Sequence, residues 1–93
     1  MISKLKIALL QIAPCKTLEE NLEKGIVCCR KAKERGADIA LFPEMWSNGY
    51  NIYGRHFDEW KAEAISADSD FINTFGETAK ELDMAVGITL LEK

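Results

Sequence analysis

The sequence has no long hydrophobic run and no surplus of basic residues. No apolar stretch approaches the roughly 20 residues that span a bilayer, so we expect no transmembrane segment. The formal net charge of -3, with Lys and Arg spread among acidic residues, argues against a nucleic-acid partner. The opening MISKLKIALLQIAPC is interrupted by Gln11 and lacks a small-residue cleavage pattern, which favours a strand over a secretory signal.

Cysteine and histidine are scarce as well. There are three cysteines, an odd number, and Cys28 and Cys29 are adjacent on an expected helix, where their side chains diverge by about 100°. This pattern argues against a disulfide framework and favours a reducing, cytoplasmic setting. Because His56 is the only histidine, a tetrahedral zinc site would need all of these scattered residues or carboxylates. We therefore expect no metal site.

Apolar runs alternate with amphipathic segments along the chain. The runs are nearly continuous, which is typical of parallel strands buried on both faces. A capping-box pattern from Thr17 to Glu20 begins the first helix, and Gly36 is placed to end it. Asp68 is a candidate cap for the last helix. The expected strands are 5–12, 38–42 and 84–91, and the expected helices are 17–36, 55–65 and 69–83.

This order predicts a single α/β unit over residues 1–93 with mainly parallel strands. Crossovers of this length suit parallel strands that are joined by right-handed connections through helices. Three strands of the buried type need layers on both faces of their sheet, and the chain offers few helices to cover them. We therefore expect the domain to be incomplete.

Residues 41–50, LFPEMWSNGY, place one carboxylate directly after the second expected strand. Ligands of α/β sheets gather at the carboxyl ends of strands, where Glu44 lies. Partial desolvation by Phe42, Trp46 and Tyr50 would raise the pKa of Glu44 and suit it to proton transfer near neutral pH. The alternative is a loop carboxylate that caps the next turn or pairs with Arg55.

The same segment resembles the first catalytic segment of the nitrilase superfamily, the carbon-nitrogen hydrolases. The motif 41–45, LFPEM, and the following 48–50, NGY, carry this resemblance. Other segments resemble the family in the same order, and together they extend over essentially all 93 residues: KIALLQ at 6–11, Asn21, GAD at 36–38, AKE at 79–81 and AVGI at 85–88.

The resemblance implies an αββα sandwich that commonly pairs across subunits, and hence a homo-oligomer. It implies hydrolysis of a small linear amide, nitrile or ureido compound by a Glu-Lys-Cys triad, without cofactor or metal. Glu44 would be the general base that takes the proton from the cysteine nucleophile. Trp46 and Tyr50, and with them Tyr53, would line the substrate pocket, although aromatic residues in a short loop often pin it to the core. His56 is either a proton shuttle or a solvent-facing residue that opens the next helix.

The sequence departs from the family pattern in one respect. The family's lysine and cysteine follow the strand that is last in this chain, and Lys80 and Lys93 do not match the triad lysine. Cys15, Cys28 and Cys29 match no nucleophile position, and the helical pair is expected to pack as small apolar residues. We therefore expect an inactive, truncated portion of a hydrolase. The alternative is a non-catalytic α/β module for binding or self-assembly.

Overall fold

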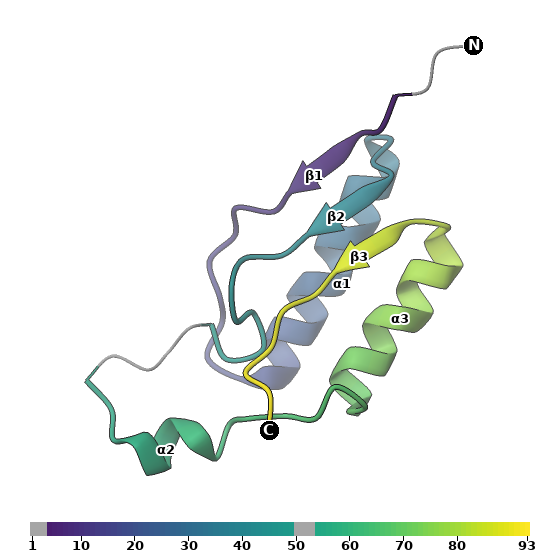
Figure 1. The fold of residues 1–93 in the computed structure, drawn as a ribbon. Coiled ribbons are helices and arrows are strands. Elements are labelled where there is room, and N and C mark those ends of the chain that lie inside the picture. Colours follow the sequence, from purple (N-terminus) through teal and green to yellow (C-terminus); the bar gives the residue numbers. More distant parts are fainter. Residues whose placement is uncertain (1–3, 50–53) are drawn as a thin grey trace.

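The computed structural model describes residues 4–49 and 54–93, which form three strands and three helices (Figure 1). In chain order they are β1 (Ile7–Leu9), α1 (Leu18–Glu34), β2 (Ile39–Leu41), α2 (Phe57–Lys61), α3 (Asp70–Leu82) and β3 (Ala85–Gly87). The protein is therefore α/β, as the sequence predicts. None of the helices within these ranges is long and apolar enough to cross a membrane.

The three strands form one parallel sheet in the order β1-β2-β3. Leu41 of β2 pairs with Leu9 on one side and Gly87 on the other. Each strand spans three residues and is shorter than its apolar run. One reason lies next to Leu41: the N–H of Phe42 still donates to the carbonyl of Gly87 in β3, at 2.9 Å, but Pro43 has no N–H with which to continue the ladder on the side of β1.

Helices α1 and α3 cover the same face of this sheet (Figure 1). Right-handed crossovers that proceed in one direction across a parallel sheet place both connecting helices on one side. Between these helices and the sheet lies the core, whose buried members are Cys29, Ala32, Ala37, Ala40, Phe42, Trp46, Phe71, Phe75 and Met84. The rings of Phe42, Phe71 and Phe75 stack edge to face at its centre.

The ends of α1 follow the signals in the sequence. The oxygen of the Thr17 hydroxyl accepts from the backbone N–H of Glu20 at 3.1 Å, and the hydroxyl donates to the Glu20 carboxylate at 3.0 Å. Gly36 has φ +86°, the left-handed conformation expected after a helix. The predicted helix 17–36 is thus confirmed to within two residues at each end.

The helices in the second half of the chain differ more from the predictions. Helix α2 has only five residues, whereas the pattern suggested 55–65. Helix α3 agrees with the expected 69–83, but its N-cap is Ser69, so the assignment of Asp68 as the cap is wrong.

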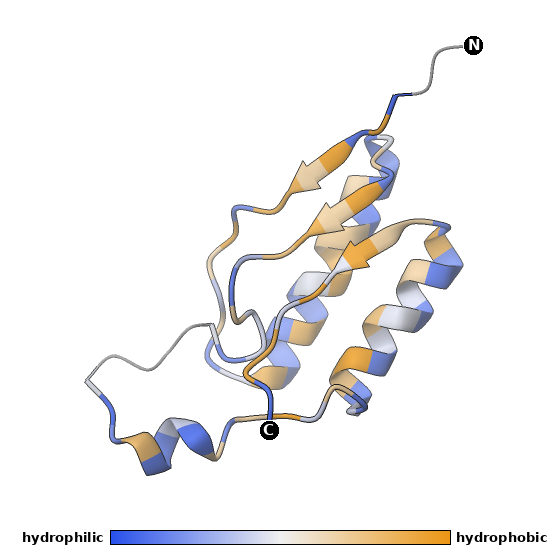
Figure 2. Cartoon of the chain, viewed as in Figure 1, coloured by the Kyte–Doolittle hydropathy of each residue, from blue (hydrophilic) through white to orange (hydrophobic). Residues whose placement is uncertain are grey.

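The other face of the sheet carries apolar side chains that no described residue covers. Ile7 is 47% exposed, Leu9 69% and Leu41 38%, and Figure 2 shows the strands coloured as apolar along their length. The expectation that the strands are buried on both faces is therefore wrong for this chain. Continuous apolar runs are typical of strands that are covered on both faces, whereas both crossover helices lie on the opposite side of this sheet. That the domain is incomplete stays a prediction.

Candidate active site

Glu44 lies where the sequence places it, just beyond the carboxyl end of β2. It begins a turn over residues 44–49, in which the next residue, Met45, has φ +51°. The Glu44 side chain is exposed, whereas Phe42 and Trp46 on either side are buried in the core. The expected desolvation of Glu44 by these aromatic rings is therefore wrong, because the rings turn inward and the carboxylate does not.

The alternative roles for Glu44 are not observed either. Its carboxylate forms no hydrogen bond or ion pair with any residue in 4–49 or 54–93. Arg55, the suggested partner, instead forms a two-pronged pair with Glu63, at 3.1 and 3.0 Å, and approaches Glu59 at 3.8 Å. Glu44 is therefore an exposed carboxylate whose oxygens are not engaged within the described part of the chain.

Trp46 has the surroundings of a loop anchor. It is 1% exposed, its ring lies 5.6 Å from that of Phe42, and its indole N–H donates to the carbonyl of Asn21 at 3.0 Å. Substrate binding by Trp46 stays a prediction, and its burial gives that prediction no support. Tyr50 and Tyr53, the other expected pocket residues, lie outside the described residues.

Asn21 has a larger role than its sequence position suggested. Its side chain is 1% exposed and joins two segments at the carboxyl edge of the sheet. The amide oxygen accepts from the N–H of Cys15 at 2.6 Å, and the amide nitrogen donates to the carbonyl of Ser47 at 3.3 Å. The available signal was its spacing: Asn21 is four residues before Gly25 and eight before Cys29, on the buried stripe of α1.

Ser47 is a second residue that sequence reasoning missed. It is 2% exposed, and its hydroxyl oxygen accepts from the N–H of Leu91 at 3.0 Å. With Asn21 it ties the turn of Glu44 to α1 and to the segment after β3. Buried polar groups satisfied in this way fix a local conformation.

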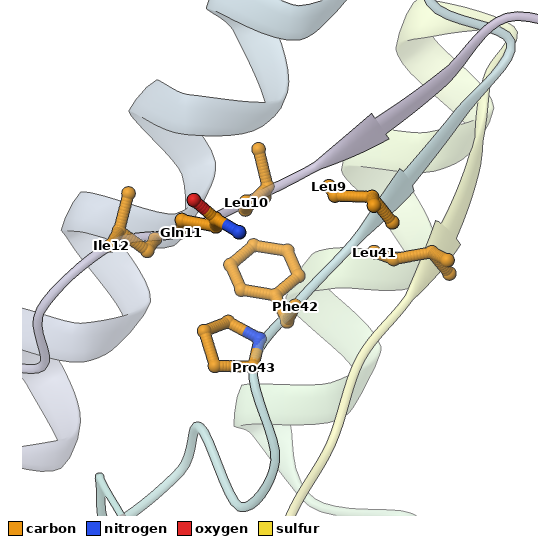
Figure 3. Close-up of a pocket in the computed structure, with 7 residues that line it drawn as sticks. All are labelled: Leu9, Leu10, Gln11, Ile12, Leu41, Phe42 and Pro43. Carbon is orange, nitrogen blue, oxygen red and sulfur yellow. The ribbon is translucent and has the colours of Figure 1, made fainter.

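An open depression of about 620 Å³ adjoins this turn (Figure 3). Its walls are mostly apolar and come from the carboxyl ends of β1 and β2: Leu9, Leu10, Gln11, Ile12, Leu41, Phe42 and Pro43. Gln11 brings an amide that can both donate and accept hydrogen bonds. Pro43 directly precedes Glu44, so the depression and the carboxylate share one edge of the sheet.

The cysteines and the histidine are not arranged as a catalytic group. Cys29 is completely buried, and burial, with a smaller contribution from Cys28 and an opposing one from Arg30, raises the pKa of its thiol from 9.0 to about 11. Such a thiol is a poor nucleophile, in agreement with the expected packing role. Cys15 and Cys28 are half-buried and free. His56 is exposed and precedes α2, which matches the solvent-facing alternative.

The chain is similar to a family model and to known proteins of related names. The family model described as carbon-nitrogen hydrolase matches residues 6–93. An aliphatic nitrilase of Sinorhizobium fredii (strain HH103) is 30% identical over 107 aligned residues, which cover 99% of this chain and 35% of the nitrilase. An N-carbamoylputrescine amidase of Oryza sativa subsp. japonica is 25% identical over 91 residues, which cover 98% of this chain and 30% of the amidase.

A third relative shares a shorter segment. A glutamine-dependent NAD(+) synthetase of Thermotoga maritima is 38% identical over 50 residues, which cover 53% of this chain and 9% of the synthetase. The chain thus spans about a third of the length of the nitrilase and of the amidase.

Proposed function

The chain belongs to the carbon-nitrogen hydrolase family, and on this premise we propose that it is the N-terminal portion of an enzyme that hydrolyses a small linear amide, nitrile or ureido compound. The names of the nitrilase and of the carbamoylputrescine amidase support this range of substrates. The free cysteines suit the reducing cytoplasm, which we propose as its location.

Glu44 is the general base of the proposed reaction. It removes the proton from a cysteine thiol, whose sulfur attacks the carbonyl or nitrile carbon. For an amide, the proton passes to the substrate nitrogen, and the C–N bond breaks to release an amine or ammonia and leave a thioester-type intermediate. For a nitrile, the sulfur adds to the C≡N bond, and the resulting thioimidate takes up water and releases ammonia to reach the same intermediate. A lysine stabilises the negative charge that develops, and water then releases the acid. The observation that carries this role is the exposed, unengaged Glu44 carboxylate on a turn whose neighbours are buried and hydrogen-bonded.

The 93-residue chain alone is proposed to be inactive. The triad lysine and cysteine belong to segments beyond these residues, and the buried Cys29 has a pKa that disfavours the thiolate. General-base catalysis is worth about 10²- to 10⁴-fold and does not replace the nucleophile.

The uncovered sheet face supports the αββα arrangement for the complete enzyme. A second sheet packed on Ile7, Leu9 and Leu41 would bury the apolar surface that α1 and α3 leave open.

The test is replacement of Glu44 by Gln in the complete enzyme, which removes the proton acceptor and keeps the size of the side chain. We expect kcat to fall at least about 10²-fold, with unchanged circular dichroism. Glu77→Gln, at an exposed position of α3, is the matched control and should retain full activity. Turnover near the wild-type value in the Glu44 variant would remove the assignment.

A second candidate is a non-catalytic module that self-associates through the same sheet face. The exposure of Leu9 and Leu41 favours it, because large apolar patches mark contact surfaces. Light scattering after size-exclusion chromatography should then show an oligomer that Leu9→Lys dissociates. Val27→Lys, at a 50% exposed position of α1, should leave it intact. A stable wild-type monomer would contradict self-association. It would also contradict the proposal that the exposed face of the sheet needs a second layer to cover it.

A further inference from the structure

The backbone of the turn that carries Glu44 is strained at Met45, whose φ of +51° lies in the left-handed region. A non-glycine residue persists in this conformation only where surrounding contacts hold it. The ladder between β2 and β3 cannot supply these contacts, because the pairing ends at Leu41 and Gly87 and its last hydrogen bond comes from the N–H of Phe42, before the turn begins. Another group must therefore fix the turn.

The side chain of Thr89 occupies this position. Its hydroxyl oxygen accepts from the backbone N–H of Trp46 at 2.9 Å, and its O–H donates to the carbonyl of Pro43. A threonine hydroxyl has one proton to donate, and here that proton and an acceptor lone pair are both used within one turn. A single side-chain atom thus joins the residues on either side of Glu44 and Met45.

Thr89 is itself held by the sheet. It follows β3 by two residues, and the last ladder bond, from the N–H of Phe42 to the carbonyl of Gly87, sets the two segments side by side. At the far end of the turn, the carbonyl of Ser47 accepts a hydrogen bond from the side-chain amide of Asn21, and its hydroxyl oxygen accepts one from the N–H of Leu91. The backbone on both sides of Glu44 is therefore fixed, and the Glu44 side chain is free to meet a reactant.

We propose that Thr89 is a positioning residue for Glu44: its hydroxyl holds the turn in the one conformation that presents the carboxylate at the carboxyl edge of the sheet. This inference rests on the proposed function, in which Glu44 is the base. Proton transfer depends on placement, and a displacement of about 1 Å in a catalytic group reduces turnover about 10²-fold.

The first test measures hydrogen exchange of the Trp46 amide in the 93-residue chain by NMR, relative to the amide of Cys29 in α1. Thr89→Val removes the hydroxyl and keeps the shape of the side chain, and it should accelerate exchange at Trp46 about 10-fold or more. Thr89→Ser restores the hydroxyl and should keep the wild-type ratio. Thr74→Val removes a threonine hydroxyl bonded to the carbonyl of Asp70 in α3, and it should leave the ratio unchanged. An unchanged ratio in Thr89→Val overturns the inference.

The second test measures kcat and KM in the complete hydrolase. Thr89→Val should lower kcat about 10- to 100-fold with little change in KM, and Thr89→Ser should restore it. In a Glu44→Gln background the valine substitution should have almost no further effect, because its action passes through Glu44. An equal loss in both backgrounds would show a general structural role and overturn the inference.

The two proposals fail in different ways. Full activity of Glu44→Gln would remove the proposed function and this inference together. A wild-type kcat in Thr89→Val, with Glu44→Gln inactive, would remove the inference alone.

Discussion

Gly25 and Gly76 are both helical glycines, yet alanine should have opposite effects at the two positions. A Cβ at Gly25 would lie 2.5 Å from Cζ and 2.9 Å from Cε1 of Phe75, and 3.0 Å from Cε1 of Phe42. Phe75 is 1% exposed and is enclosed by Phe42 and Phe71, with ring centroids 5.1 and 5.2 Å away. Its ring therefore cannot move aside without displacing its neighbours.

The magnitude follows from two opposing effects. Alanine is favoured over glycine within a helix by about 0.5–1 kcal/mol, and this gain applies at both positions. Overpacking of a core costs about 1–3 kcal/mol, and it applies only at Gly25, because a Cβ at Gly76 would have no atom within 4 Å. We expect Gly76→Ala to stabilise the fold and Gly25→Ala to destabilise it by about 1 kcal/mol.

Urea unfolding followed by tryptophan fluorescence gives both free energies of unfolding. The difference between the variants cancels the helix preference and isolates the overpacking, so it should be about 1–3 kcal/mol. For a domain of this size each 1 kcal/mol shifts Tm by about 4–8 °C. Equal stabilities, within about 0.3 kcal/mol, would refute the close packing of α1 on the phenylalanine cluster.

Further predictions concern the cysteine, the helix caps and acid stability. In a variant that keeps only Cys29, the thiol should resist a disulfide reagent at pH 8 until the protein unfolds. Its pKa of about 11 lowers the thiolate fraction about 100-fold relative to a thiol with a pKa of 9.0. Rapid labelling of the native protein would contradict the burial of Cys29. Thr17→Ala should lower the free energy of unfolding by about 1 kcal/mol. Ser69→Ala should be nearly neutral, because the buried Ser69 hydroxyl has no partner within residues 4–49 and 54–93. Hydrogen bonds from Arg55 hold the pKa of Glu63 below its ordinary value of 4.5. Their contribution to stability is therefore complete above pH 4.5, and it is lost as the pH falls through the lower pKa that Glu63 has in the folded protein. Glu63→Gln should remove this part of the acid dependence in a pH series of thermal melts, and an unchanged dependence would argue against the pair.

Local signals in the sequence predicted the order of the helices and strands, but they predicted the first and last residues of most of them less well. The capping box at Thr17 and the glycine at position 36 act within a few residues, so α1 was located closely. The cap of α3 was misassigned because Asp68 and Ser69 are adjacent and both are suitable cap residues, so residue type alone does not decide between them. The exposure of Glu44 was missed because neighbours in sequence were taken as neighbours in space.

The amino-acid sequence by itself determined the α/β order, the parallel sheet and the place of Glu44 at the end of β2. These follow from short-range patterns: apolar runs, helix caps and the proline that ends a ladder. Only the tertiary structure decided that α1 and α3 share one face of the sheet, that Trp46 points into the core, and that Asn21 and Thr89 hold the turn. Hydrogen bonds between residues more than 25 positions apart have no local signature, because packing of the elements brings their partners together.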